Sequence, residues 1–420
     1  MVGMRRSLMM VVAAAVVAPL ALSGCGDKKS GTTAAWASPD ASSSALPGAS
    51  SSASGGSITE SADAPITLSV TPAAGKKDVP VSAEIGVSLT GAKVTAVSLK
   101  DSAGKVVGGE LRDDGTSWVP ASTLKAKTAY AATVTATTSS GLTKTATTTF
   151  TTMGAPAKKT GTGLYLFDNR TYGVAMPVVV EFSPGIKKAD RAAVEKRMFV
   201  ETSPAQPGVW SWTSSGTQAY YRAKEHWQTG TTLKVRIAVG GLPTGGGRYG
   251  DRDRGATAKI GRDLEMKVDN ATKKMTVTQD GKVVRTALVS LGRKSKPSVS
   301  GNMVVMDKLA DTVFDTTDTD GAAGYQTKIQ YAQRVTWSGQ YVHSAPWSVG
   351  SQGRTNVSHG CVNVSPSNAK WLFDNTLIGD PITVTGTGVK LAYGDGWTPW
   401  NVSWAEFLKG SALPVPDSLK

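Results

Sequence analysis

Apolar and polar residues alternate with a period of two over many short segments of this chain, beginning at residue 66. Residues 66–70 and 130–135 are two clear examples, and turn-forming residues follow each of them. Such alternation is typical of strands that bury one face. Residues 187–198 are an exception, because they read as one short helix. The pattern therefore predicts a mainly β protein.

Two parts of this β-rich region resemble each other at a distance of about one hundred residues. The Gly-Thr-Ser-Trp-Val of residues 115–119 corresponds to the Gly-Thr-Gln-Ala-Tyr of residues 216–220. The Val-Pro-Val of residues 79–81 likewise corresponds to the Met-Pro-Val of residues 176–178. We therefore expect two tandem immunoglobulin-like β-sandwiches, at residues 65–153 and 154–255.

Neither expected sandwich contains a group of residues typical of catalysis. His226 has no cysteine or acidic cluster beside it in the sequence, and we interpret it as a structural or surface histidine. The glycine-rich residues 240–250 lack the Gly-Lys-Ser/Thr of a phosphate loop, which favours a turn or hinge. The two sandwiches are thus expected to act as spacers or as wall-binding units.

The first 64 residues have a different pattern. Arg5 and Arg6 precede an apolar run at residues 8–22, which is too short for a comfortable membrane span and typical of a signal peptide. The run ends in Leu22-Ser23-Gly24-Cys25, which resembles the bacterial lipobox. The resemblance implies that residues 1–24 are removed and that Cys25 becomes a lipidated N-terminus. The alternative is a secreted protein with a chance cysteine.

A lipid-anchored Cys25 changes the expected location of the protein. Two or three acyl chains would hold it firmly to a membrane. Residues 25–64 are rich in Ser, Ala, Gly, Thr and Pro, and they are expected to form a flexible tether. We therefore expect the protein on the extracytoplasmic face of the cell membrane, reaching into the cell wall.

The formal net charge of +14 suits anionic partners such as lipid head groups or wall phosphates. No Lys/Arg block with interleaved aromatic residues resembles a nucleic-acid module, so no nucleic-acid partner is expected.

The only cysteines are Cys25 and Cys361, at opposite ends of the chain. A disulfide framework is therefore not expected, and each cysteine needs its own explanation.

The sequence around Cys361 permits nucleophilic chemistry. An unperturbed thiol has a pKa of about 8.5, and an imidazole such as that of His343 or His359 can take its proton. Gly360 permits close backbone approach, and adjacent N–H groups can stabilise an oxyanion. Acyl transfer is the predicted reaction class. A zinc site would need more ligands than one cysteine and these histidines, so no metal is expected. The remaining alternative to a nucleophile is a buried, inert cysteine.

The spacing of these residues resembles a known family. His343, fourteen further residues and then Ser358-His359-Gly360-Cys361-x-Asn363 match the signature of the L,D-transpeptidases. The resemblance covers about residues 258–386, and the sandwiches and lipobox resemble actinobacterial members. It implies a β-rich L,D-transpeptidase catalytic domain at residues 256–386, followed by a Trp-rich extension at residues 387–420 with a short helical tail.

The family resemblance also implies roles for individual residues. Cys361 is then the nucleophile and His343 its general base and later acid. Ser344 would orient His343, His359 would support the site, and Gly360 with Cys361 would supply oxyanion N–H groups. No cofactor is implied. The positions that match substrate-binding residues are Tyr325, Ser338, Gly339 and Asn363.

By the same resemblance, Cys361 attacks a peptidoglycan tetrapeptide stem between its third and fourth residues and releases D-Ala. The amine of a neighbouring diaminopimelate then resolves the thioester and forms a 3→3 cross-link. Carbapenems acylate family members of this type. Alternatives are an L,D-carboxypeptidase, in which water resolves the thioester, and a non-catalytic wall-binding lipoprotein. A sortase is disfavoured because it lacks the Ser-His-Gly-Cys context.

Two further segments of the C-terminal third are interpreted from their patterns. The acidic, glycine-bearing residues 315–324 fail the spacing of a calcium loop, and we expect a lid over the active site. Apolar residues at spacings of three and four in the tail predict a helical stripe packed on the catalytic domain, with sugar binding as the alternative. The stripe consists of Trp397, Trp400, Trp404, Phe407 and Leu408.

Overall fold

The computed structural model describes residues 65–315, 317, 321, 324 and 326–420. Cys25, the expected tether, Tyr325 and most of the expected lid lie outside the described residues. Within the described part, no helix is long and apolar enough to span a membrane. Strands dominate, as the alternating sequence pattern predicted.

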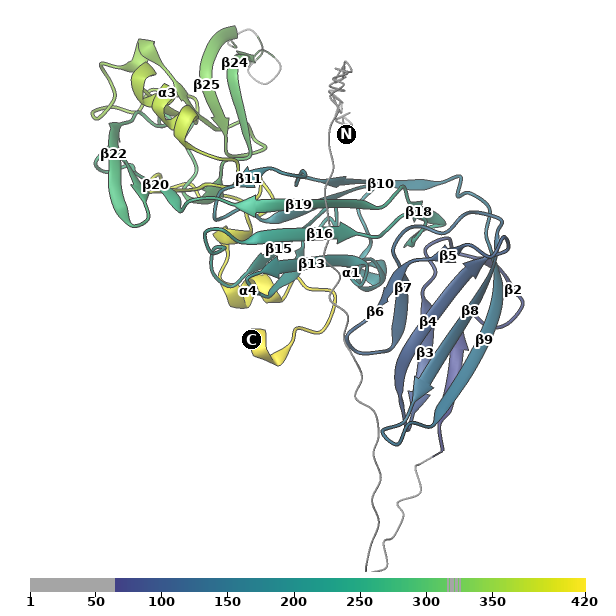
Figure 1. The fold of residues 1–420 in the computed structure, drawn as a ribbon. Coiled ribbons are helices and arrows are strands. Elements are labelled where there is room, and N and C mark those ends of the chain that lie inside the picture. The colour runs from purple at the N-terminus through teal and green to yellow at the C-terminus, as the bar shows by residue number, and fades with distance from the viewer. Residues whose placement is uncertain (1–64, 316, 318–320, 322–323, 325) are drawn as a thin grey trace, which may run out of the picture. The chain divides into compact units, whose positions relative to one another are not determined.

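The first sandwich consists of two sheets (Figure 1). Its apolar core includes the fully buried Ile85, Leu99 and Val134, from both sheets. One sheet has the order β1 (Thr67–Thr71), β3 (Ile85–Thr90), β7 (Ser117–Pro120) and β6 (Gly109–Leu111). The other has the order β2 (Lys76–Val79), β9 (Thr143–Thr152), β8 (Ala129–Thr137), β4 (Lys93–Asp101) and β5 (Val106–Val107).

The second sandwich repeats this arrangement. Its first sheet has the order β14 (Gly208–Trp212), β15 (Gln218–Ala223), β12 (Val178–Ser183), β10 (Lys159–Leu164), β18 (Arg248–Gly250) and β17 (Pro243–Gly245). Its second has the order β11 (Thr171–Tyr172), β19 (Arg254–Ile260), β16 (Thr232–Ile237) and β13 (Met198–Ser203). The strands aligned by the sequence repeat, β7 and β15, occupy equivalent places beside β3 and β12.

Three details of the second sandwich differ from expectation. The helix is shorter, with a 3-10 turn η1 (Lys188–Asp190) and α1 (Arg191–Glu195), because Met198 already enters β13. The glycine-rich segment is no hinge, since β17 and β18 form a hairpin and β18 pairs with β10. The expected boundary at residues 255 and 256 falls inside β19, which pairs with β16 as far as Lys259. The second sandwich therefore extends to the end of β19.

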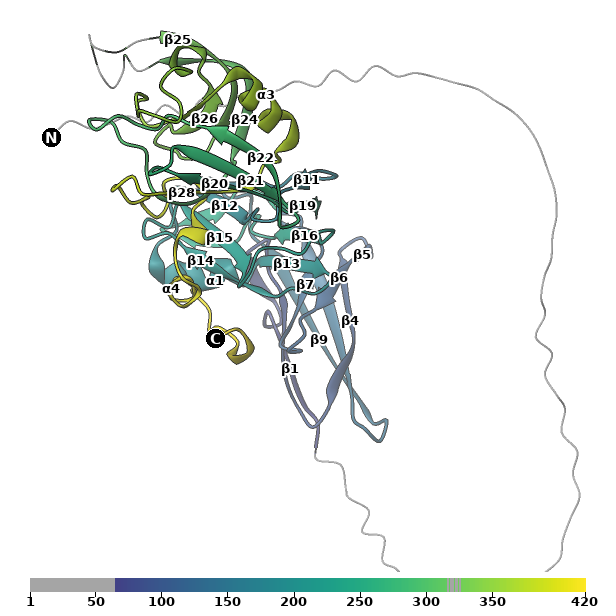
Figure 2. The same cartoon turned by 90° about the vertical axis from the view of Figure 1, so that its left-hand side faces the viewer.

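The catalytic domain implied by the family resemblance also contains two sheets (Figure 2). The first has the order β22 (Lys282–Leu288), β21 (Lys274–Gln279), β20 (Leu264–Asp269), β28 (Pro381–Thr385) and β23 (Gly301–Val304). The second has the order β24 (Asp307–Asp315), β25 (Gln326–Arg334), β26 (Tyr341–Ser344) and β27 (Val362–Val364). A 3-10 turn η3 (Pro346–Ser348) follows β26, and α3 (Pro366–Asn375) follows β27.

Local sequence explains where these elements begin and turn. Asp280 and Gly281 both have positive φ, which gives β21 and β22 a tight hairpin of the kind that Asp-Gly favours. The side chain of Ser365 accepts a hydrogen bond from the Asn368 N–H and caps α3, with Pro366 at its first position. α3 thus starts directly after the strand that follows Cys361.

The C-terminal extension does not form the expected helical stripe on the catalytic domain. Val402 is extended and Ser403 caps a new helix, so Trp400 lies in η4 (Pro399–Asn401) and Trp404 in α4 (Trp404–Leu408), while Trp397 precedes both. The last element is η5 (Asp417–Leu419). Trp397 and Phe407 belong to the core of the second sandwich. The Arg222 guanidinium lies 4.5 Å from the centroids of the Trp400 and Phe407 rings. The extension therefore packs on the second sandwich as well as on the catalytic domain, where Asn401 Oδ1 accepts from the Asn302 N–H at 3.0 Å.

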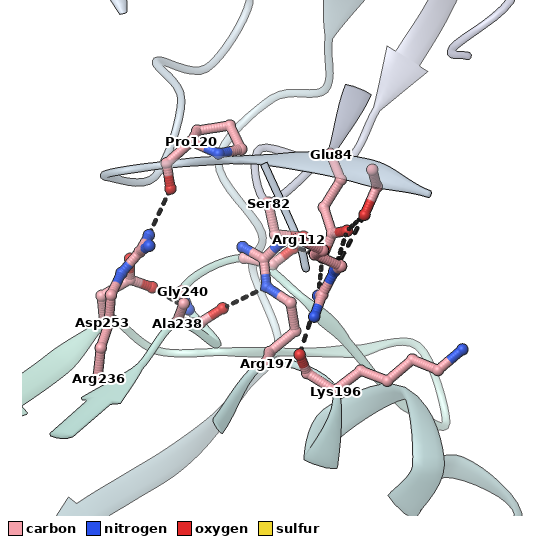
Figure 3. Close-up of polar contacts among 12 residues, drawn as sticks. Ser82, Glu84, Arg112, Pro120, Lys196, Arg197, Arg236, Ala238, Gly240 and Asp253 are labelled. Atoms are coloured by element: carbon pink, nitrogen blue, oxygen red, sulfur yellow. Dashed lines mark hydrogen bonds and ion pairs between the residues drawn. The ribbon is translucent and has the colours of Figure 1, made fainter. Parts of the chain in front are cut away.

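Charged side chains join the two sandwiches (Figure 3). Glu84 of the first sandwich accepts from Arg112 at 2.6 Å and from Arg197 of the second sandwich at 2.7 Å. The Arg197 side chain is only 5% exposed, and its Nε donates to the Ala238 carbonyl at 3.0 Å. Burial by itself would raise the pKa of Glu84, but hydrogen bonds from Arg112, Ser117 and Arg197 outweigh it and lower the pKa to about 2. Glu84 is thus ionised at neutral pH and compensates a buried cation.

Replacing Glu84 with alanine should lower the free energy of unfolding by about 2 kcal/mol, because the buried Arg197 guanidinium loses its carboxylate. A matched control is Glu201→Ala, whose partner Lys234 lies 3.0 Å away in an exposed pair, and which should cost under about 1 kcal/mol. Urea denaturation followed by tryptophan fluorescence measures both. Since folding lowers the pKa of Glu84 from 4.5 to about 2, its stabilisation is present above pH 4.5 and disappears as the pH falls towards 2. Equal losses in the two variants would contradict this role for Glu84.

Candidate active site

A parallel strand pair brings the histidine and the cysteine of the motif together. β26 and β27 pair in parallel, with Val342 opposite Val362 and His343 opposite Asn363. Cys361 immediately precedes β27 and follows the tight Ser358–Gly360 turn. Because side chains two positions apart in a strand share a face, this register directs Cys361 and His343 to the same side of the sheet.

The Cys361 thiol is partly exposed, and backbone groups surround it. Its Sγ donates a weak hydrogen bond to the Gly339 carbonyl, with a separation of 3.9 Å. Burial raises the pKa of the thiol to about 12, although a hydrogen bond with the Tyr341 backbone acts in the opposite direction. The sulfur therefore carries its proton at neutral pH in the unliganded site.

The His343 ring is buried, with 3% of the residue exposed, and held in one orientation. Its Nδ1 lies 2.8 Å from the Ser344 carbonyl oxygen, which can only accept a hydrogen bond. Nδ1 therefore carries the proton of the neutral ring, and Nε2 keeps its lone pair. Burial lowers the pKa of His343 to about 4, although the hydrogen bond to Ser344 acts in the opposite direction. Ser344 thus orients the imidazole through its backbone carbonyl.

Aromatic side chains enclose this imidazole. Phe314 of β24 makes an edge contact with the His343 ring at a centroid distance of 5.2 Å, and Trp347 lies 6.1 Å away. Trp347 itself is largely exposed, at 59%. These rings account for the loss of hydration at His343. A neutral thiol can transfer its proton to a neutral imidazole on the same side of the sheet as the sulfur attacks an acyl group, because burial disfavours either charged form alone.

Serine side chains shape the backbone of the Ser358–Cys361 turn. Ser358 Oγ donates to the Cys361 carbonyl at 2.7 Å and accepts from the Gly360 N–H at 3.2 Å. Ser298 Oγ donates to the Gly360 carbonyl at 2.6 Å. Gly360 has φ of 125°, in a region that favours glycine. The Gly360 N–H, expected to face an oxyanion, is therefore bonded within the turn in this structure.

The expected substrate-binding residues have different surroundings. Ser338 and Gly339 lie exposed in the turn that leads to β26, and the Gly339 carbonyl faces the thiol. Asn363 is 2% exposed and its Nδ2 donates to Ser348 Oγ at 3.2 Å, so it supports the site from inside. Its Oδ1 is buried with no hydrogen-bond partner among the described residues. His359 is half-buried on the Cys361 turn.

Sequence reasoning missed several residues of this site. Ser298 and Phe314 contact the turn and the imidazole from segments 62 and 29 residues away in the chain. Asp395 of the C-terminal extension contacts Ser338. No local pattern marks such residues, because only the fold brings them to the motif. Among the described residues, no group of three or more His, Cys, Asp or Glu side chains could hold a metal ion.

Family models and known proteins match most of this chain. Residues 76–243 match the model of a bacterial Ig domain, and residues 265–384 match that of an L,D-transpeptidase catalytic domain. L,D-transpeptidase 2 of Mycobacterium tuberculosis (strain CDC 1551 / Oshkosh) is 32% identical over 352 residues, which cover 83% of this chain and 85% of that protein. L,D-transpeptidase 5 of M. tuberculosis (strain ATCC 25618 / H37Rv) is 33% identical over 358 residues, which cover 83% and 78%. A crystal structure of M. tuberculosis L,D-transpeptidase 1 is 32% identical over 55% of this chain and 100% of that chain, with a TM-score of 0.42.

The raised pKa of Cys361 predicts an unusual reactivity profile. With Cys25→Ser, Cys361 is the only thiol in the chain. Its alkylation rate with iodoacetamide should rise about tenfold per pH unit between pH 7 and 10 without a plateau, because the pKa is about 12. The matched control is the same protein in denaturant, where the rate should level off above pH 9, the ordinary value. A plateau near neutral pH in the folded protein would instead indicate a preformed thiolate–imidazolium pair.

Proposed function

Because this chain belongs to the L,D-transpeptidase family, we propose that it forms 3→3 cross-links in peptidoglycan through a thioester on Cys361. The observation that carries this proposal is the parallel pairing of β26 and β27. It sets the imidazole of His343, with Nε2 ready to accept a proton, beside the Cys361 turn. A transpeptidase needs this combination of nucleophile and base in order to open an amide.

The first half of the proposed reaction acylates the enzyme. The Cys361 sulfur attacks the carbonyl between the third and fourth residues of a tetrapeptide stem, and its proton moves to His343 Nε2. The Ser344 carbonyl, which accepts from Nδ1–H, stabilises the imidazolium. That imidazolium then protonates the departing amine, so that D-Ala leaves and the thioester remains.

The tetrahedral intermediate needs donors for its oxyanion. We assign this role to the backbone N–H groups of Gly360 and Cys361, each worth about 3 kcal/mol in such sites. In the free chain the Gly360 N–H donates to Ser358 Oγ at 3.2 Å, a longer bond than those that hold the Gly360 and Cys361 carbonyls. Exchange of that bond for the oxyanion would favour the transition state over the ground state.

The second half of the proposed reaction resolves the thioester. The amine of a neighbouring stem's diaminopimelate loses a proton to His343 and attacks the thioester carbonyl, which returns the thiol and leaves a 3→3 linkage. If water took the place of the amine, the product would be a trimmed tripeptide, as in an L,D-carboxypeptidase. We place Tyr325, Ser338 and Gly339 along the bound stem, and we expect a carbapenem to acylate Cys361.

We further propose that the protein is anchored to the membrane through lipids on Cys25. The lipobox-like Leu22-Ser23-Gly24-Cys25 supports this, as does the low apolar content of residues 26–64 that follow. An anchored chain with such a tether would work on the extracytoplasmic face of the membrane, where its stem-peptide substrates lie.

A mass-spectrometric assay tests the proposed reaction. The purified protein is incubated with disaccharide tetrapeptides, and a cross-linked dimer is expected. Cys361→Ala should abolish the product, His343→Ala should slow it by about 10²–10⁴-fold because proton transfer is lost, and the control Cys25→Ser should keep full activity on soluble substrate. Only trimmed tripeptide would favour the carboxypeptidase, and an active Cys361→Ala protein would refute the assignment of the nucleophile.

Metabolic labelling tests the anchor separately. Cells that express the full chain are grown with radiolabelled palmitate, and the protein is expected to carry the label. Cys25→Ser should lose it, because the acceptor thiol is gone, whereas Cys361→Ser serves as the matched control and should retain it. Label that persists in Cys25→Ser would exclude the anchor.

A further inference from the structure

A turn of the C-terminal extension lies directly against the turn that precedes β26. Gly396 has φ of 108°, and a Cβ built on it would lie 3.0 Å from the Val335 carbonyl oxygen and 3.1 Å from Met306 Sδ. Only a residue without a side chain permits this close approach. The extension therefore contacts the segment that carries Ser338 and Gly339.

Asp395, the residue before Gly396, binds Ser338 through both carboxylate oxygens. The Ser338 N–H donates to Oδ1 at 2.7 Å, and Ser338 Oγ donates to Oδ2 at 2.6 Å. Hydrogen bonds to a carboxylate of this length are stronger than bonds between neutral groups. Within the same turn, Thr336 Oγ1 accepts from the Gln340 N–H at 3.0 Å. Ser338 Oγ lies 2.9 Å from Thr336 Oγ1, so these two hydroxyls link the carboxylate to the Gln340 N–H.

The Gly339–Gln340 peptide reaches the thiol. Its N–H, that of Gln340, is held by Thr336 Oγ1, and its oxygen, the Gly339 carbonyl, accepts the hydrogen bond from Cys361 Sγ. Gly339 has φ of 94°, and a Cβ built there would meet no atom within 4 Å. No side-chain packing holds Gly339 in place, so the hydrogen bonds of the turn determine where its carbonyl points. They are the bonds that link Asp395, Ser338, Thr336 and Gln340, and the bond of 3.4 Å from the Gly339 N–H to the Thr336 carbonyl.

The second sandwich holds the other side of the Asp395 turn. The buried Tyr220 of β15 donates its hydroxyl to the Gly396 carbonyl at 2.9 Å. Tyr165 contacts the Trp397 ring edge-on at a centroid distance of 5.2 Å. A continuous series of contacts thus runs from the second sandwich through the extension to the thiol.

We propose that Asp395 is a positioning residue for the nucleophile, acting through Ser338 and the Gly339 carbonyl. It holds the carbonyl that receives the thiol's hydrogen bond and so directs the thiol for attack, and it makes the reaction depend on the docked C-terminal extension. This inference rests on the proposed function of Cys361. It adds a residue that lies 34 positions beyond the cysteine and outside the catalytic motif.

The test compares three variants of the full chain that also carry Cys25→Ser. Asp395→Ala should lower kcat/KM for the tetrapeptide by about 10- to 100-fold, mainly in kcat, because a misplaced reacting group costs rate. Asp395→Asn should lose less, since its Oδ1 can still accept from the Ser338 N–H. The control Asp417→Ala removes an acid that is 95% exposed in the same extension, and it should match the parent protein.

A second readout separates positioning from loss of structure. Without the fixed Gly339 carbonyl, the thiolate of Cys361 is less disfavoured, so alkylation at pH 8 should be faster in Asp395→Ala although peptide turnover is slower. The melting temperature should stay within about 2 °C of that of Asp417→Ala. If Asp395→Ala fails to fold, Asp395→Asn carries both measurements.

A double-variant cycle tests whether Asp395 acts through Ser338. Since Ser338→Ala removes one of the two bonds to Asp395, the added effect of Asp395→Ala in that background should be smaller than in the parent. Wild-type kinetics and alkylation in both Asp395 variants would overturn the positioning role and leave the proposed reaction intact. Absence of product from the parent protein would refute the proposed reaction, and the alkylation comparison would still test Asp395.

Discussion

The parallel pairing of β26 with β27 is the constraint on which the site depends. In this register His343 lies opposite Asn363, two residues after Cys361. A slip of one residue would turn the imidazole to the other face of the sheet. The register is held from the outer side as well, because Ser290 and Asn363 exchange two backbone hydrogen bonds of 3.0 Å. The arrangement of His343 and Cys361 therefore depends on the register of the two strands as much as on the residues of the motif.

The two faces of this strand pair have different roles. Val342 and Val362, which lie side by side in the two strands, belong to the core of the domain. On the opposite face, burial lowers the pKa of His343 and raises that of Cys361, so each favours its neutral form. The ion pair common among cysteine nucleophiles is therefore not stored in the free site. In the proposed reaction its formation is tied to the arrival of an acyl group, which limits side reactions of the thiol.

The sequence predicted what depends on local patterns. Period-two alternation indicated the strands, the repeat indicated two similar sandwiches, and the spacing of His343 and Cys361 indicated the family. It failed where the outcome depends on a cap or on distant contacts. Ser403 starts a new helix and breaks the expected stripe, and Asp395 reaches Ser338 across 57 positions. Such contacts produce no periodic pattern in the sequence, because a single carboxylate can bind any turn that the fold brings close to it.

The two junctions of the second sandwich differ in their chemistry, and this difference bears on the site. Towards the catalytic domain, backbone groups bond directly, as in Gly173 N–H to the Ile378 carbonyl at 2.8 Å and Gly261 N–H to the Tyr172 carbonyl at 2.8 Å. Such bonds are insensitive to pH and salt. Towards the first sandwich, the charged Glu84 bonds to Arg197 beside a neutral bond of 3.2 Å from Ser82 Oγ to the Gly241 carbonyl, and charged contacts weaken in acid and at high ionic strength. Acid and salt therefore weaken the contact between the sandwiches more than these backbone bonds to the catalytic domain, the domain whose Ser338–Gly339 turn the C-terminal extension contacts.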